Sequence, residues 1–526
     1  MARLLIAACL GIVATAPHAH PQQLTEAQKQ AAAQAITILD EAAAAISEIE
    51  DLDSRMSAIR MTVPAYARAG RPEHGRELLH RFWKALRSDE SVPARKRDSA
   101  VMEAAMHFTN LGAPADAAEI AAEVADPSYR FAALSTAAGG YARLGQSAKA
   151  LEIAASVAEP WRDGAYERVA YACIGHRDFA CASAAVETVG DPSLKARLLT
   201  RLAGARARQG SADRAAEAVT KARDIAGELP DSGHATAGSS YARCLPAAHQ
   251  TPRDSALRDV AETQLGLDDF QGARESLKGI GDPEVRENVL VSMAAKAARK
   301  KDFTLAFSLA GEIRRPECRS EALSLIALYQ YRSGDAAGAR VTIDRIPAVS
   351  ERVYGLLNIA GSQWARDREA VATTLAFASE IALQVPDETE RLALLLEVAR
   401  RQMRAGSREQ ALSTLRSAQS LAVSLPPQPQ NRGMRNWNGL LLTLCELLAE
   451  TGDLPAAAEI ARRTQSERSS GARIARGATR GGQGDAARSW AASLPTPGER
   501  TAALVGIAVG ILDRAGIGRT RSESLW

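Results

Sequence analysis

Apolar positions recur at helical spacing along most of the chain. In residues 126–158 they fall every three or four positions, first over 131–141 and again over 150–157. The two faces consist of Phe131, Leu134, Ala138 and Tyr141, and of Ala150, Ile153, Ala154 and Val157. This spacing is typical of two half-buried helices. No run of alternating β-branched and aromatic residues predicts a strand.

Short turns that contain glycine separate many of these helices. They read LGAPADAAEIA (111–121), LGQSAKALEIA (144–154), QGSADRAAEAV (209–219), SGDAAGARVTI (333–343), AGSREQALSTL (405–415), TGDLPAAAEIA (451–461) and QGDAARSWAAS (483–493). In HRDFACASAAV (176–186), LDDFQGARESL (267–277) and KKDFTLAFSLA (300–310), we expect Asp to replace the glycine. Glycine ends a helix because it tolerates positive φ, and Ser or Asp caps the next helix.

A second kind of turn contains proline. It reads DPSYRFAAL (126–134), DPSLKARLL (191–199), DPEVRENVL (282–290), RPECRSEAL (315–323) and TPGERTAAL (496–504). Asp before Pro predicts an N-cap followed by a first-turn proline. An arginine recurs nearby, at Arg130, Arg286, Arg319, Arg391 and Arg500. Because it follows the repeat period, we expect it to make a structural contact to a neighbouring unit, for instance to Glu119 or Glu152.

The alternation of the two turns predicts stacked helical hairpins. Their period is roughly 31–40 residues, in the range of helical repeats. The chain has 526 residues, whereas one compact core rarely exceeds roughly 250–300 residues. A stack of repeats is not subject to this size limit, because each unit packs only on its neighbours. We therefore predict an all-α solenoid of antiparallel helical hairpins.

This arrangement resembles the tetratricopeptide repeat family. With Gly145 as the turn glycine, Leu134, Tyr141, Ala150 and Ala154 fall at that family's apolar and small positions. The resemblance covers roughly residues 100–515, and it implies a right-handed superhelix with a ligand-binding concave face. The chain departs from the family in lacking the early-helix tryptophan, in carrying Ala at the small position and in the lengths of several units.

The pattern suggests six segments. They are a signal peptide over 1–19, an N-terminal helical capping segment over 20–95, a first block of repeats over 96–230, an irregular break or hinge over 231–252, a second block of repeats over 253–494, and a C-terminal capping helix and tail over 495–526. The break is rich in Gly, Ser and Pro, which interrupt helices. A second irregular stretch, 426–438, is expected to be an exposed loop.

The N-terminus predicts export. Arg3 precedes an apolar stretch from Leu4 to Ala14, which is of signal-peptide length and too short to span a membrane. A buried first helix is the alternative. We expect a periplasmic or secreted protein without a transmembrane span in the mature chain. Cys173 and Cys181 flank one turn, so that either a disulfide or two buried thiols can be expected there.

Composition and motifs argue against several functions. The formal net charge is +3 and only 4% of residues are aromatic, which disfavours nucleic-acid binding. No phosphate-binding glycine loop, H-E-x-x-H or G-x-S-x-G motif occurs. Two weak metal candidates are Glu77 and His80 with Glu103 and His107, and Cys173 and Cys181 with His176. Neither offers a complete ligand set, so we predict no metal, no cofactor and no enzymatic activity.

These observations favour a scaffold that binds an extended peptide or protein on the concave face of the solenoid. The resemblance places the more apolar part of that face at Leu328, Tyr331, Leu396, Arg400 and Met403. Two alternatives stay open. One is a cell-envelope enzyme of the superhelical murein transglycosylase type, although the repeats leave no room for its catalytic domain. The other is a self-assembling structural factor.

Overall fold

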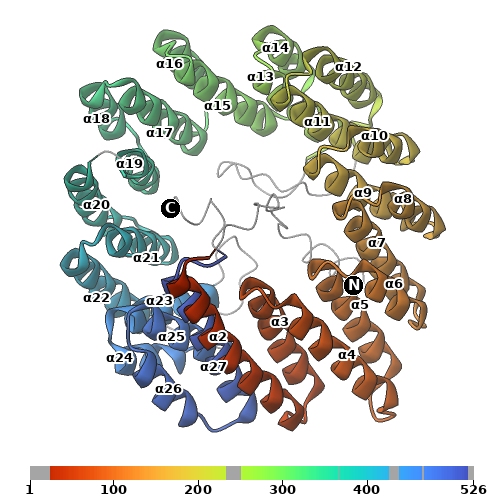
Figure 1. The fold of residues 1–526 in the computed structure, drawn as a ribbon. Helices are drawn as coiled ribbons and strands as arrows, with labels where there is room; N and C mark the ends of the chain where they lie inside the picture. Colours follow the sequence, from red (N-terminus) through yellow and green to blue (C-terminus); the bar gives the residue numbers. More distant parts are fainter. Residues whose placement is uncertain (1–23, 233–249, 365–366, 426–436, 465–466, 519–526) are drawn as a thin grey trace. The chain divides into compact units, whose positions relative to one another are not determined.

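A computed structural model describes residues 24–232, 250–364, 367–425, 437–464 and 467–518. These residues form 26 α-helices and no strand (Figure 1). They divide into two compact units. Unit 1 comprises residues 1–26 and 79–222, and unit 2 comprises residues 27–78 and 223–526. The predicted signal peptide, most of the predicted hinge and residues 426–436 lie outside the described residues.

Unit 1 is a stack of helical hairpins. Its hairpins are α5 (Ala94–Asn110) with α6 (Pro114–Ala122), α7 (Pro127–Arg143) with α8 (Ser147–Ser156), α9 (Arg162–Gly175) with α10 (Phe179–Thr188), and α11 (Pro192–Arg208) with most of α12 (Ala212–Glu228). The first helices of successive hairpins pack on one another, as α5 does on α7 and α7 on α9. Most of α4 (Pro72–Ser88) also belongs to this unit.

Unit 2 continues the same pattern. Its hairpins are α13 (Pro252–Gly266) with α14 (Phe270–Gly279), α15 (Pro283–Arg299) with α16 (Phe303–Glu312), α17 (Pro316–Ser333) with α18 (Ala336–Asp344), α19 (Val349–Gln363) with α20 (Arg368–Ala382), α21 (Glu388–Ala405) with α22 (Arg408–Ser424), α23 (Trp437–Thr451) with α24 (Leu454–Ala461), and α25 (Glu467–Arg480) with α26 (Gly484–Ala492). The last helix is α27 (Pro497–Arg514). The predicted all-α array of antiparallel hairpins is confirmed, while the superhelical handedness stays a prediction. Within the described chain, no helix combines the length and apolarity that a membrane span requires.

The glycine turns form as predicted, with a correction of register. Gly145 has a φ of 74°, the left-handed conformation expected at a helix end. In the three variant turns the left-handed residue is Arg177, Asp268 or Lys301, and the Asp after each caps the next helix. Asp therefore replaces the glycine, as expected, only at Asp268; in the other two turns a basic residue takes that position and the Asp follows it. In the glycine turn predicted over 483–493, the left-handed residue is Gly482 and not Gly484, which is the first residue of α26.

The proline turns start helices in the predicted way. The side chains of Asp126, Asp191 and Asp282 accept hydrogen bonds from backbone N–H groups of the first turn, with Pro as the first helical residue. The recurring arginine is structural, but its partner differs from the acids that we expected. In four repeats the guanidinium donates to a backbone carbonyl six residues earlier, at the end of the preceding helix. These pairs are Arg130 with Val124, Arg319 with Ile313, Arg391 with Val385, and Arg500 with Leu494.

Successive hairpins are tied together by an acceptor side chain that the sequence pattern did not reveal. Asp98 accepts hydrogen bonds from the backbone N–H groups of Ala125 and Asp126, which start the next hairpin. The same link joins Asp163 to residues 190 and 191, Asp254 to residues 281 and 282, Glu287 to residues 314 and 315, and Ser320 to residue 348. Because helix-starting N–H groups have no partner within their own helix, these side chains satisfy donors that would otherwise be orphaned.

The N-terminal helices dock on the C-terminal end of unit 2. Helices α2 (Glu26–Ala45) and α3 (Leu52–Arg68) are joined by a hydrogen bond of 2.7 Å from Tyr66 to Asp40. Arg68 donates to Asp513 at 2.6 Å and to the carbonyl of Ile517 at 2.9 Å. We predicted one capping segment over 20–95, whereas the structure places residues 27–78 in unit 2 and the residues after them in unit 1.

Glycines allow α23, α25 and α27 to approach closely. A Cβ atom at Gly477 or Gly481 of α25 would overlap the backbone carbonyl of Glu446 or Glu450 in α23. A Cβ atom at Gly506 of α27 would overlap the carbonyl of Ala472 in α25. Each glycine therefore removes a side chain where two helix backbones are in contact.

We predict that Gly477→Ala lowers the free energy of unfolding by about 2 kcal/mol, because the added methyl forces α25 away from α23. Urea denaturation followed by circular dichroism measures this. The control is Gly227→Ala, at an exposed helical position where a Cβ atom meets nothing within 4 Å. It should leave stability equal or raise it by about 0.5 kcal/mol. Equal losses in the two variants would contradict the close approach.

We predict that Arg68→Gln loosens the docking of residues 27–68 on α27, because it removes the charged group that donates to both Asp513 and the carbonyl of Ile517. The loss of a hydrogen bond to a charged group, about 1.5–3 kcal/mol, corresponds to hydrogen exchange faster by about tenfold or more in α2 and α3. Arg71→Gln is the matched control, since Arg71 pairs with Glu73 and both side chains are more than half exposed. Unchanged exchange in Arg68→Gln would contradict the docking.

Candidate functional site

The five predicted binding residues do not form one surface. Leu328 and Leu396 are 8% and 2% exposed, so both belong to the core and neither can contact a partner. The prediction fails there because these leucines lie where successive hairpins pack together. Tyr331 is half-buried on α17 and lines neither of the cavities described below. Arg400 and Met403, on α21, line one cavity in unit 2.

This cavity, which we call the arginine cavity, has a volume of about 230 Å³ and is lined from α21, α23, α25 and α27. Its lining residues are Arg400, Met403, Arg404, Thr443, Glu446, Leu447, Glu450, Arg473, Arg476, Arg480 and Asp513. Five arginines therefore face three carboxylates, with apolar surface from one methionine and one leucine. The cavity lies where the glycines bring the three last long helices together.

The arginines of α25 are held by the carboxylates of the neighbouring helices. Arg473 lies 2.5 Å from Glu446, and Arg480 lies 3.2 Å from the same side chain. Arg480 also pairs with Glu450. Arg476 donates to Asp513 at 2.6 Å. Spacings of three and four residues put the three guanidiniums on one face of α25, so the network fixes a row of positive groups along the cavity.

The two central carboxylates are buried and ionised. Glu446 and Asp513 have side chains only 8% and 4% exposed. Burial acts to raise the pKa of Glu446, but Arg476, Arg473 and Arg480 outweigh it, and the pKa falls below its usual range. Burial likewise acts to raise the pKa of Asp513, and its ion pairs lower the pKa on balance. Each carboxylate therefore carries a negative charge that orients guanidiniums around it.

The same pairing keeps the arginines charged. Burial acts to lower the pKa of Arg476 and of Arg480, but hydrogen bonds to Asp513 and Glu450 and the nearby charges raise both. The side chain of Arg473 is 43% exposed, and that of Arg476 is 33% exposed. Their guanidiniums can therefore contact carboxylates behind them and still offer N–H donors to a ligand.

Among the binding residues predicted from the sequence are Arg400 and Met403, which line this cavity, but not the α25 arginines. The repeat pattern is defined by its apolar positions. In the sequence, the spacing of Arg473, Arg476 and Arg480 is typical of an ordinary polar helix face. A usable signal was present in the spacing of Gly477 and Gly481, because two small residues four apart favour a close helix crossing. Charged groups that flank such a crossing are brought near the neighbouring helix.

Unit 1 contains a second cavity of about 240 Å³ between α10, α11 and α12. Its charged lining comprises Arg206, Arg214, Lys221, Glu187 and Glu217. Here the ion pairs are exposed ones, between Lys221 and Glu217 at 3.0 Å within α12 and between Lys195 and Glu187 at 3.8 Å. No carboxylate in it is buried as Glu446 is. This cavity serves below as a comparison for the arginine cavity.

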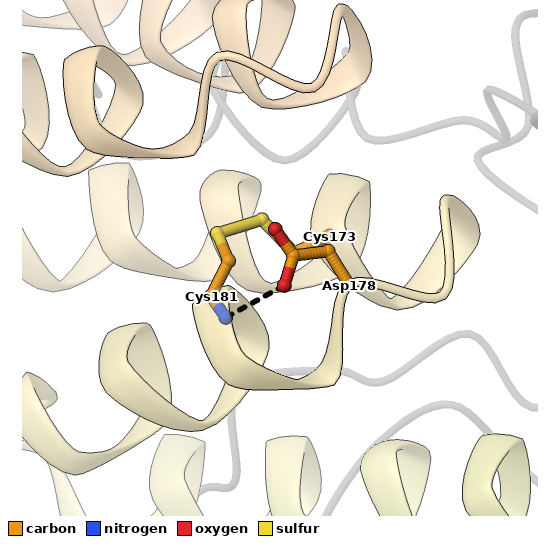
Figure 2. A group of neighbouring side chains, drawn as sticks. All are labelled: Cys173, Asp178 and Cys181. Atoms are coloured by element: carbon orange, nitrogen blue, oxygen red, sulfur yellow. Dashed lines mark hydrogen bonds between the residues drawn. A yellow bond between two sulfur atoms is a disulfide. The ribbon is translucent and has the colours of Figure 1, made fainter.

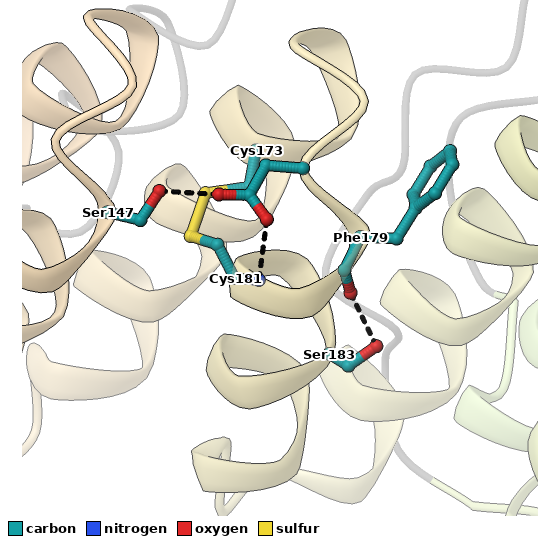
Figure 3. The surroundings of a disulfide bond; sticks show 6 residues. Ser147, Cys173, Phe179, Cys181 and Ser183 are labelled. Carbon is teal, nitrogen blue, oxygen red and sulfur yellow. Dashed lines mark hydrogen bonds between the residues drawn. A yellow bond between two sulfur atoms is a disulfide. The ribbon is translucent and has the colours of Figure 1, made fainter.

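Cys173 and Cys181 are joined by a disulfide that ties α9 to α10 (Figure 2). Asp178 caps α10 by accepting a hydrogen bond from the backbone N–H of Cys181 at 3.0 Å. It also accepts a hydrogen bond from the hydroxyl of Ser147 at 2.6 Å, next to the disulfide (Figure 3). The two sulfur atoms and Asp178 lie close enough for a shared metal ion. Sulfur atoms in a disulfide are not thiolates, however, and therefore do not bind a metal ion as thiolates do. The disulfide instead links the two helices on either side of one turn.

In the other predicted metal site, His80 and His107 have different partners. His80 lies 3.7 Å from Asp116 and packs against Phe108, while His107 is buried 3.8 Å from Glu103. The structure therefore gives each histidine its own acid. Among the described residues, no group of three ligands forms around either histidine within metal-binding reach.

Comparisons with known proteins add little to this description. No protein-family profile matches the chain, and no curated protein matches it. Among solved structures, Ton1535 from Thermococcus onnurineus NA1 is 14% identical over 70% of this chain and 96% of its own, with a TM-score of 0.23. The Naa15/Naa10 complex bound to HypK-THB is 15% identical over 83% and 67%, with a TM-score of 0.24, and the APC/C hetero-tetramer Cut9–Hcn1 is 13% identical over 79% and 96%, with a TM-score of 0.19. Likenesses at such TM-scores carry no argument, so the fold assignment rests on the helical hairpins of this chain.

We predict that the arginine cavity makes the protein sensitive to acid. A carboxylate with a lowered pKa stabilises the folded state fully above its unfolded pKa of about 4, and this contribution is lost as the pH falls through the folded value. Glu446→Gln should therefore be less stable than the wild type at pH 7, and the difference should shrink below about pH 4. Thermal unfolding from pH 7 to pH 3 measures it. Glu459→Gln, at an exposed position of α24, should reproduce the wild-type profile, and a constant difference for Glu446→Gln would refute the prediction.

Proposed function

We propose that this protein is a non-catalytic scaffold that binds an extended segment of another polypeptide in the arginine cavity. The observation that carries the proposal is that four helices of successive hairpins present charged and apolar groups to one cavity. Stacked repeats commonly bind partners on surfaces shared between neighbouring units. The resemblance to tetratricopeptide repeats also predicts Arg400 and Met403 on a ligand-binding face.

The chemistry of the cavity favours binding over glycoside cleavage. A murein-cleaving enzyme needs a carboxyl group that is protonated at working pH so that it can act as an acid. Glu446 and Asp513 have lowered pKa values because arginines surround them. Both carboxylates are therefore suited to orienting guanidiniums and unsuited to donating a proton.

We further propose that the protein acts outside the cytoplasm, in the periplasm or as a secreted protein. Two observations support this. The first residues have the pattern of a signal peptide, and Cys173 and Cys181 are bonded. Structural disulfides persist in oxidising compartments and are rare in reducing ones. A mass spectrum of the protein from its source cells would test both points, because an uncleaved N-terminus would contradict export.

We predict that a photo-crosslinking residue at position 403 captures a partner polypeptide in the cells that make the protein. The control carries the same residue in place of Leu383, which is 48% exposed at the end of α20 and lies outside the cavity. One dominant adduct at 403 and none at 383 supports the proposal. An adduct with the mass of two copies of this chain would favour self-assembly instead, and equal labelling at both positions would exclude the cavity as the binding site.

A further inference from the structure

We infer that the arginine cavity recognises the side-chain carboxylates of an acidic stretch within the partner. This inference rests on the proposed function and adds the chemistry of the bound segment. The lining carries five arginines and three carboxylates, and Arg400 also pairs with Glu397 at 3.0 Å. Guanidiniums therefore outnumber the carboxylates that contact them, which favours an anionic segment.

The arginines of the cavity come from two helices. Arg400 and Arg404 lie on α21, one turn apart, and Arg473, Arg476 and Arg480 lie on α25. Helix α23 lies between them in the chain and contributes Glu446 and Glu450. Because the two groups of guanidiniums belong to different helices, the cavity can address two acidic side chains of one segment rather than a single anion.

Arg473 is the best placed of these groups for a ligand. It donates to Glu446 from one Nη atom, and 43% of its side chain is exposed. A guanidinium has five N–H donors in a planar fork that matches a carboxylate. Since Glu446 fixes the orientation of this fork before any ligand arrives, little side-chain entropy remains to be lost on binding.

The rest of the lining favours a side chain of a polypeptide over a free anion such as phosphate. Met403 and Leu447 add apolar surface that suits the methylene groups of glutamate or a neighbouring apolar residue.

The test is fluorescence anisotropy with the full chain and a fluorescein-labelled peptide of alternating glutamate and leucine. Its C-terminus is amidated, so that only side-chain carboxylates are present. The same peptide with glutamine in place of glutamate should bind at least about tenfold more weakly. Arg473→Gln and Arg404→Gln should each weaken binding of the glutamate peptide by about tenfold. Arg404→Gln leaves the pairs of Glu446 intact, and therefore reports on binding should Arg473→Gln fail to fold.

Two controls separate this cavity from general attraction to positive charge. Arg214→Gln, in the cavity of unit 1, should bind the glutamate peptide as the wild type does. Inorganic phosphate in millimolar excess should displace the peptide no better than chloride at equal ionic strength. Equal binding of the two peptides, an equal loss in Arg214→Gln, or selective displacement by phosphate would each overturn the inference. Crosslinking at position 403 tests the proposed function separately. If a partner is captured there but the glutamate peptide does not bind, only the inferred preference for an acidic segment is refuted.

Discussion

At five steps of the array, a hydrogen bond ties one hairpin to the start of the next, and it sets the register in which they stack. A helix begins with backbone N–H groups that its own turns cannot satisfy. In both units a side chain of the previous hairpin accepts from this pair of donors, as Asp98 does from Ala125 and Asp126. The bond fixes where the next helix starts, and hence which of its residues are buried against the previous hairpin. Asp163, Asp254, Glu287 and Ser320 repeat it, so the register of the stack is set by polar contacts as well as by apolar packing.

The C-terminal end of unit 2 uses a tighter arrangement. Gly477 and Gly481 let α25 touch the backbone of α23, and this approach brings the arginines of α25 to the carboxylates on either side. Asp513 connects two features of the unit, since it accepts from Arg476 in the cavity and from Arg68 in the docked N-terminal segment. The arginine cavity is therefore a product of close helix packing, and ion pairs hold its charges in place.

Much of the architecture could be read from local patterns. The turns, the Asp-Pro helix starts and the spacing of apolar residues follow from backbone conformation and capping, which depend on a few neighbouring residues. The errors came from the limits of such patterns. Asp178 was assigned to the position of a glycine although it caps the helix that follows. Leu328 and Leu396 were assigned to an open face, because the sequence shows that a helix has two sides without showing how deeply the next hairpin covers each.

That this chain is a stack of helical hairpins follows from local sequence, because helix propensity, capping and apolar periodicity act over distances of a few residues. The docking of residues 27–78 on the last helix instead depends on tertiary contacts, such as that between Arg68 and Asp513. Tertiary packing also brings Arg400 and Met403 into one cavity with Arg473, Arg476 and Arg480. These groups are up to 80 positions apart in the sequence, and their distances depend on how closely the helices between them pack.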